Sequence, residues 1–191
     1  FPGARSLFTS PASVLEIALL ADGVAPADVY PIDIDRAFAK LEQIKPDVLT
    51  WWSSGAQSAQ LVLNGEVDMV AIWNGRIQAA MADGANADFT FNQQVLNYDC
   101  MMIPKGAPNA ELAREVVAKF ISADYQARLP QHINYGPTNA KAFDTGIISD
   151  ELAAQLPSSP ENMENALVLD PAWWIPHIDE LTERYTLLAN Q

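Results

Sequence analysis

The stretch Asp68–Ala80, read as DMVAIWNGRIQAA, constrains the fold of this chain most strongly. Its first part, Met69–Trp73, is an apolar run with β-branched and aromatic members, which is typical of a buried strand. Asn74 is a good helix N-cap, and the residues through Met81 favour a helix. The pattern therefore predicts a strand that passes directly into a helix, as in α/β folds.

This junction places two side chains of chemical interest. Trp73 and Arg76 fall where the predicted strand ends and the predicted helix begins. Ligands bind outside the carboxyl ends of strands in open α/β sheets, and the N-terminus of a helix attracts anions. Trp73 and Arg76 are therefore candidate ligand-binding residues. These residues alone leave open an ordinary strand–turn–helix with a surface arginine.

Strand and helix patterns alternate along the first half of the chain. The predicted strands are 5–8, 48–52, 69–73 and 89–91, and the predicted helices are 14–20, 35–44, 56–63 and 77–81. We expect Asp35 to cap the second helix, and Ser53–Gly55 to open the third. This order argues for an α/β layer structure with a parallel or mixed sheet.

The second half is expected to contain one more strand, Val95–Pro104, followed by helices at 109–121, 124–131, 149–156 and 172–188. Asp124 is the expected cap of the second of these helices. Asp99 lies inside the expected strand. An unpaired carboxylate in a buried run is costly, so it needs a cation or several donors. Asp99 is thus a further candidate ligand-binding residue. The alternative is that neighbouring backbone N–H groups or an internal arginine satisfy the hydrogen-bonding needs of its carboxylate.

Composition excludes several classes of partner. The 191 residues can bury a core as one large or two small domains, and the formal net charge is −13. Phosphate backbones and anionic lipids would repel such a chain, so we expect no nucleic acid partner. No apolar run is long enough for membrane insertion. The first five residues, FPGAR, lack the apolar core of a signal peptide.

Signatures of catalysis are missing from the sequence. Cys100 is the single cysteine, and His132 and His177 lie far apart, so neither a disulfide nor a metal site is expected. No nucleophile elbow, P-loop or dinucleotide turn occurs, so we expect no catalytic residue and no cofactor. Ser54, between a predicted strand and a predicted helix, opens a segment whose backbone N–H groups suit a ligand anion. Tyr98 and the tryptophans offer aromatic faces for an ammonium group.

A series of segments follows one another in a familiar order: FPGARSL, SVLEIALLADG, AFAKLEQIKPDV, WWSSGAQ, LNGEVDM with IWNGR, NYDCMMIPKGAPN, YGPTNAKAF, LPSSPEN and PAWW. Together they resemble the periplasmic solute-binding proteins of ABC importers, in the spermidine/putrescine (polyamine) branch, along almost the whole chain. The resemblance implies an α/β, periplasmic binding protein-like fold of type II, whose two lobes close on the ligand at a hinge. It also implies a periplasmic location and an ABC permease as partner, with the signal peptide not present in this chain.

The resemblance further implies how the chain is divided. Residues 1–99 would form the first part of the second lobe and end at the hinge, and residues 100–134 would return to the first lobe, the rest of which is absent. Residues 135–191 would cross back and complete the second lobe.

The same resemblance points to a pocket. Polyamine-binding members have a tryptophan in the WNG motif and an aspartate shortly before an Ile-Pro pair, which correspond to Trp73 and Asp99. Asn97 replaces an aromatic residue two places before that aspartate, and Tyr98 is adjacent. Arg76 replaces a small uncharged residue and is suited to bind a carboxylate bidentately. A ligand with an amine at one end and a carboxylate at the other would satisfy Asp99 and Arg76 together.

The sequence thus predicts a non-enzymatic substrate-binding component of an ABC importer, which captures a small amine-bearing solute. The solute is a polyamine or an ω-amino acid such as γ-aminobutyrate, bound through Trp73, Arg76, Asp99, Tyr98, Asn97 and Ser54. Two alternatives stay open. One is an α/β enzyme, such as a transferase, without a recognisable catalytic motif. The other is a structural or interaction domain in which Arg76 and Asp99 pair in the core.

Overall fold

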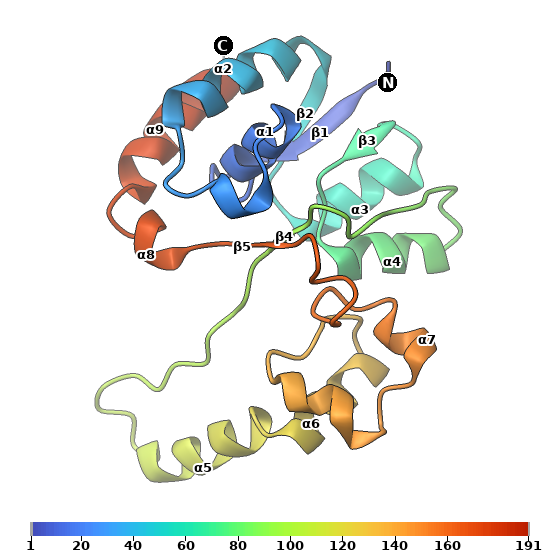
Figure 1. Ribbon diagram of the computed structural model, residues 1–191, viewed down its shortest axis with the longest axis vertical. Coiled ribbons are helices and arrows are strands. Elements are labelled where there is room, and N and C mark those ends of the chain that lie inside the picture. Colours follow the sequence, from blue (N-terminus) through green and yellow to red (C-terminus); the bar gives the residue numbers. More distant parts are fainter. Residues whose placement is uncertain (1, 191) are drawn as a thin grey trace. The chain divides into compact units, whose positions relative to one another are not determined.

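The computed structural model describes residues 2–190, and the chain divides into two compact units (Figure 1). Unit 1 contains the residues up to Val95 and those from Asn165 onward, and unit 2 is Leu96–Glu164. The sequence placed the divisions after residues 99 and 134. In the structure, residues 135–164 lie in the same compact unit as the segment before them. The assignment of either unit to a lobe of a larger protein stays a prediction.

Unit 1 is built on a parallel sheet in the order β2-β1-β3. The central strand β1 (Arg5–Phe8) pairs in parallel with β2 (Val48–Trp52) and with β3 (Met69–Val70). The predicted bounds of the first two strands are confirmed. The third strand is shorter than predicted, because Ala71 makes the last hydrogen bond to β1, from its N–H to the carbonyl of Ser6 at 3.2 Å.

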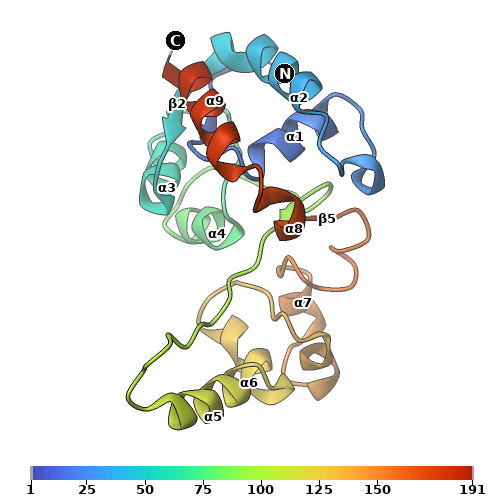
Figure 2. The same ribbon diagram turned by 90° about the vertical axis from the view of Figure 1, so that its left-hand side faces the viewer.

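Helices cover both sides of this sheet. They are α1 (Val14–Ala21), α2 (Ile34–Ile44), α3 (Gly55–Leu63), α4 (Asn74–Ala82), α8 (Pro171–Trp174) and α9 (Ile178–Asn190). Figures 1 and 2 show α3 and α4 side by side, and Figure 1 shows them away from α2 and α9. A further two-stranded sheet pairs β4 (Val95–Leu96) with β5 (Leu167–Val168), a strand that the sequence did not predict.

Three predicted features of these helices are wrong. Asp33, not Asp35, caps α2, because its Oδ1 accepts the N–H of Arg36 at 3.1 Å. Trp73 takes the N-cap position of α4, so Asn74 lies inside the helix. The predicted helix 172–188 is two helices, since α8 ends at Trp174 and Pro176 lies in the turn before α9.

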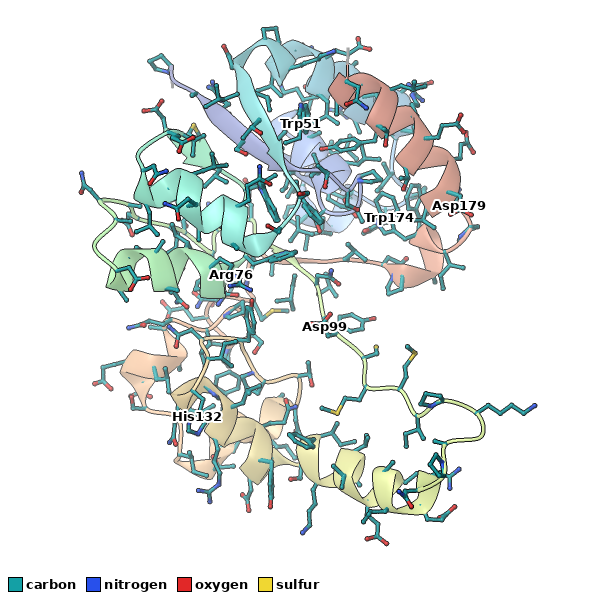
Figure 3. All side chains as sticks on the ribbon, turned by 180° about the vertical axis from the view of Figure 1, so that it is seen from behind. Trp51, Arg76, Asp99, His132, Trp174 and Asp179 are labelled. Atoms are coloured by element: carbon teal, nitrogen blue, oxygen red, sulfur yellow. The ribbon has the colours of Figure 1, made fainter. Side chains whose placement is uncertain are left out.

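The core of unit 1 joins both ends of the chain. Buried side chains from α1, α2 and α9 form one cluster with Leu167, Leu169 and Trp174. Tyr185 of α9 packs edge-on against Trp51, with ring centroids 5.4 Å apart, and its hydroxyl donates to the carbonyl of Phe8 at 2.7 Å. Figure 3 shows Trp51 and Trp174 within this unit. The C-terminal helix is thereby attached to the carboxyl end of the central strand.

Glu16 of α1 is a carboxyl group inside this core, with none of its surface exposed. Its Oε1 accepts hydrogen bonds from the Tyr30 hydroxyl at 2.5 Å and from Trp174 Nε1 at 2.6 Å. The Tyr30 oxygen in turn accepts the N–H of Asp170 at 3.1 Å. Burial raises the pKa of the Glu16 carboxyl, an effect larger than the opposite one of these hydrogen bonds.

Unit 2 has a small core of its own. It contains α5 (Ala110–Phe120), α6 (Ala123–Arg128) and α7 (Asp150–Ala153). The buried residues of this hydrophobic core are Ala127, Ala142, Ile148 and Leu156. Ser122, not Asp124, takes the N-cap position of α6, and Asp124 lies in the first turn.

Two predicted strands are wrong wholly or in part. Residues 89–91 form no strand, and Phe89 and Phe91 instead pack edge-on against each other, with centroids 5.1 Å apart. The strand predicted for Val95–Pro104 ends at Leu96, and the residues from Asn97 to Met102 are exposed. Asp99 is therefore not a buried carboxylate.

The buried Glu16 leads to a prediction about the pH dependence of stability. Its pKa is higher in the folded than in the unfolded chain, so the folded state holds the proton more tightly. The free energy of unfolding therefore falls as pH rises from about 4.5, the ordinary pKa of a glutamate carboxyl, through the folded pKa. Glu16→Gln cannot titrate, so its stability relative to wild type should increase across this window and then level off. Denaturant unfolding at a series of pH values measures the difference.

The control is Glu183→Gln, which removes an exposed carboxyl from α9. This variant should follow the wild-type pH dependence. If Glu16→Gln also followed the wild-type pH dependence, the pKa of the Glu16 carboxyl would be the same in the folded and the unfolded chain.

Candidate functional site

Three aromatic side chains meet at the carboxyl end of the parallel sheet in unit 1. Phe8 ends β1, Trp52 ends β2, and Trp73 lies between β3 and α4. Phe8 stacks on Trp52 with centroids 4.4 Å apart and planes 27° apart. Trp73 stands edge-on to both, at 5.1 Å from Trp52 and 5.5 Å from Phe8. Parallel strands end at one edge, so residues far apart in sequence form one aromatic surface.

The three rings differ in how much of each is available to a ligand. Trp52 is 2% exposed, and its Nε1 donates to the carbonyl of Ala71 at 2.9 Å, so it serves as the buried base of the group. Trp73 is 43% exposed although its edge contacts two rings. Sequence reasoning missed Phe8 as a site residue. The rule that selected Trp73, its position at the end of a predicted strand, also applies to Phe8.

The start of α3 lies beside this aromatic surface. Ser54 is the N-cap, because its Oγ accepts the N–H of Gln57 at 3.2 Å. The Gln57 side chain returns to accept the N–H of Ser53 at 2.8 Å. These reciprocal bonds fix the first turn of the helix. The structure thus gives the predicted site residue Ser54 a role in helix capping, at an exposed position.

Arg76 belongs to the first turn of α4 and is exposed. Its side chain lies against Gly55: a Cβ built on Gly55 would be 2.6 Å from Arg76 Nε and 3.1 Å from Trp73 Cε3. Arg76, Trp73 and the start of α3 are therefore neighbours. Within unit 1 as described, residues 2–95 and 165–190, no carboxylate forms an ion pair with Arg76. Figure 3 shows Arg76 on this unit.

The electrostatics of this arrangement favour an anion. The N-terminus of an α-helix carries roughly half a positive charge, and Arg76 lies near the first turns of both α3 and α4. Backbone N–H groups and a guanidinium together suit a carboxylate, which Arg binds bidentately. The site in unit 1 thus combines a positive anion-binding group with an exposed aromatic face.

The other three predicted site residues lie in unit 2. Asn97, Tyr98 and Asp99 follow β4 on an extended segment, and all three are exposed. The Oδ1 of Asn97 accepts the N–H of Tyr98 at 2.8 Å. The structure therefore groups Trp73, Arg76 and Ser54 in one unit and Asn97, Tyr98 and Asp99 in the other. That both groups bind one ligand stays a prediction. Since Arg76 and Asp99 are exposed, the structural-domain alternative, in which both are core residues, does not fit.

Two kinds of feature are absent from residues 2–190. No helix in this part of the chain has the length and apolar character needed to cross a membrane. The same residues contain no group of three or more His, Cys, Asp or Glu side chains that could hold a metal ion.

Comparison with known proteins gives the following matches. The family-wide sequence model described as bacterial extracellular solute-binding protein matches residues 1–156. A γ-aminobutyric acid-binding protein of Pseudomonas aeruginosa is 35% identical, over 99% of this chain and 54% of the relative. The spermidine/putrescine-binding periplasmic protein 1 of Haemophilus influenzae is 26% identical, over 90% of this chain and 46% of the relative. An ABC transporter substrate-binding protein structure from Bradyrhizobium japonicum is 49% identical, with a TM-score of 0.94, over 98% of this chain and 59% of that one.

These matches confirm the predicted α/β, periplasmic binding protein-like fold and the resemblance to solute-binding proteins. The chain spans about half the length of the curated relatives that it matches. It belongs to the bacterial extracellular solute-binding proteins.

Proposed function

We propose that this chain is part of the substrate-binding component of an ABC importer, which captures a small amine-bearing solute outside the cytoplasmic membrane and delivers it to the permease. Family membership supports this function, since a substrate-binding protein of an ABC transporter shares 49% of its residues. The protein is proposed to bind its solute without chemical change. The serines at the start of α3 support this view, because the side chain that contacts them is Gln57, which is no general base.

The proposed ligand is an ω-amino acid such as γ-aminobutyrate, in preference to a polyamine. The observation that carries this choice is Arg76, a guanidinium close to the first turns of α3 and α4 that has no carboxylate partner in the described part of unit 1. It would repel the second ammonium of a diamine but attract a carboxylate. The γ-aminobutyric acid-binding relative is also more similar to this chain than the polyamine-binding one, at 35% against 26% identity.

Asp99, Tyr98 and Asn97 are proposed to bind the amine end. The exposed carboxylate of Asp99 is suited to pair with an ammonium group, and an ammonium group also interacts well with aromatic faces such as those of Tyr98 and Trp73. Both rings are 43% exposed. The proposed ligand thus offers an amine to the anionic Asp99 and a carboxylate to the cationic Arg76.

Arg76→Ala tests the carboxylate end. The substitution should lower the affinity for γ-aminobutyrate about 100-fold or more, because charged hydrogen bonds contribute about 1.5–3 kcal/mol each. The fold should survive, since Arg76 is exposed. Isothermal titration calorimetry on the protein at its full natural length, with γ-aminobutyrate and with putrescine, provides the measurement.

Arg114→Ala is the matched control. It removes the same charge from an exposed position on α5 and should leave the affinity unchanged. Tight binding of putrescine by the wild type, with no response to γ-aminobutyrate, would refute the proposed ligand. An unchanged affinity in Arg76→Ala would refute the role of Arg76.

Asp99→Asn tests the amine end. The change keeps the shape of the side chain and removes its charge, so the affinity for γ-aminobutyrate should fall about 10-fold or more. Butyrate, which lacks the amine, should bind the variant and the wild type equally. Asp144→Asn, at another exposed aspartate of unit 2, serves as control. An equal loss for both ligands would mean that Asp99 does not bind the amine.

A further inference from the structure

Gly55 is the first residue of α3 and is buried. Its backbone does not adopt the positive φ that favours glycine. Glycine is also a poorer helix former than alanine, by about 1 kcal/mol in a helix interior. The local backbone therefore gives no reason for a glycine at this position.

Several other glycines show the opposite situation. Each has a positive φ, and a Cβ added to it would meet nothing within 4 Å; they are Gly23, Gly65, Gly84, Gly106 and Gly146. Backbone conformation explains a glycine at those positions. At Gly55 only the space beside the Cα remains as an explanation.

Two site residues fill that space. A Cβ at Gly55 would lie 2.6 Å from Arg76 Nε, 3.1 Å from Arg76 Cγ and 3.1 Å from Trp73 Cε3. The shortest of these distances requires a shift. Trp73 is held by ring contacts with Phe8 and Trp52. The arginine side chain has more rotatable bonds and no ring contact with the residues that the structure describes, so it is the group that would move.

We infer that Gly55 is a specificity-determining residue: its missing side chain lets the Arg76 guanidinium lie against the first turn of α3, where it selects a ligand that carries a carboxylate. This inference rests on the proposed function. The position matters because an arginine binds a carboxylate bidentately only within a narrow range of geometry. The anion is bound best where the guanidinium and the helix N-terminus act on it together. Gly55 acts through Arg76 and need not touch the ligand.

Gly55→Ala in the protein at its full natural length is the first test. The affinity for γ-aminobutyrate should fall about 10-fold or more, as expected when a bidentate charged contact is displaced. The melting temperature should stay within a few degrees of the wild type, because alanine favours the helix and the displaced arginine is exposed. Calorimetry and thermal unfolding measure the two quantities.

A double-mutant cycle separates this role from a merely structural one. In the Arg76→Ala background, Gly55→Ala should cause no further loss of affinity, since the group that it displaces is absent. If Gly55→Ala alone bound γ-aminobutyrate as tightly as wild type, the inference would be refuted while the proposed function stood. A further loss in the Arg76→Ala background would also refute it, because Gly55 would then act by another route. A wild type that did not bind γ-aminobutyrate would refute both proposals.

Discussion

The central strand β1 is hydrogen-bonded on both sides, and the arrangement of the site residues in unit 1 depends on this parallel pairing. Pairing in parallel brings the carboxyl ends of β1, β2 and β3 to one edge, so Phe8, Trp52 and Trp73 contact one another. Backbone bonds continue past the strands, as the N–H of Thr9 donates to the carbonyl of Trp52 at 3.0 Å. Near the C-terminus, the hydroxyl of Tyr185 in α9 donates to the carbonyl of Phe8. This bond ties the last helix to the same strand end. A ligand at this edge would meet a surface that both termini of the chain stabilise.

The core behind this edge contains a costly group. Glu16 lies in α1, the helix that follows β1, and its carboxyl is held by Tyr30 and Trp174. Burying an ionised carboxyl is unfavourable unless hydrogen bonds compensate for the lost solvent. Here burial still has the larger effect, because the pKa of Glu16 is raised. The interaction nevertheless joins a helix near the N-terminus to Trp174, a residue far along the sequence. It therefore gives the core a specific pairing at some cost in stability at neutral pH.

Sequence reasoning located the parts of the fold that local pattern determines. The strands 5–8 and 48–52 have short apolar patterns with clear turn signals at their ends, and both were predicted with the correct bounds. The apolar run from Val95 to Pro104 has a similar composition, but only its first two residues have a strand partner, β5. Pairing is a property of the fold, so composition could not reveal that Asp99 is exposed. Trp73 and Arg76 could be selected by a topological rule, because they lie at the end of a predicted strand. The neighbours of Gly55 are distant in sequence, so only the structure reveals the space beside it.

The net charge of the chain bears on the role proposed for Arg76. The chain has a net charge of −13, which attracts an ammonium from a distance and disfavours a carboxylate. Binding an amino acid in preference to a diamine therefore requires a local positive potential that exceeds this background. Salt screens the long-range field within about 10 Å, whereas a contact pair at a partly desolvated helix end is screened far less. The guanidinium beside the first turn of α3 supplies such a contact, and Gly55 provides the space for it. The proposed selection of a carboxylate-bearing ligand thus depends on a short-range arrangement that opposes the average charge of the chain.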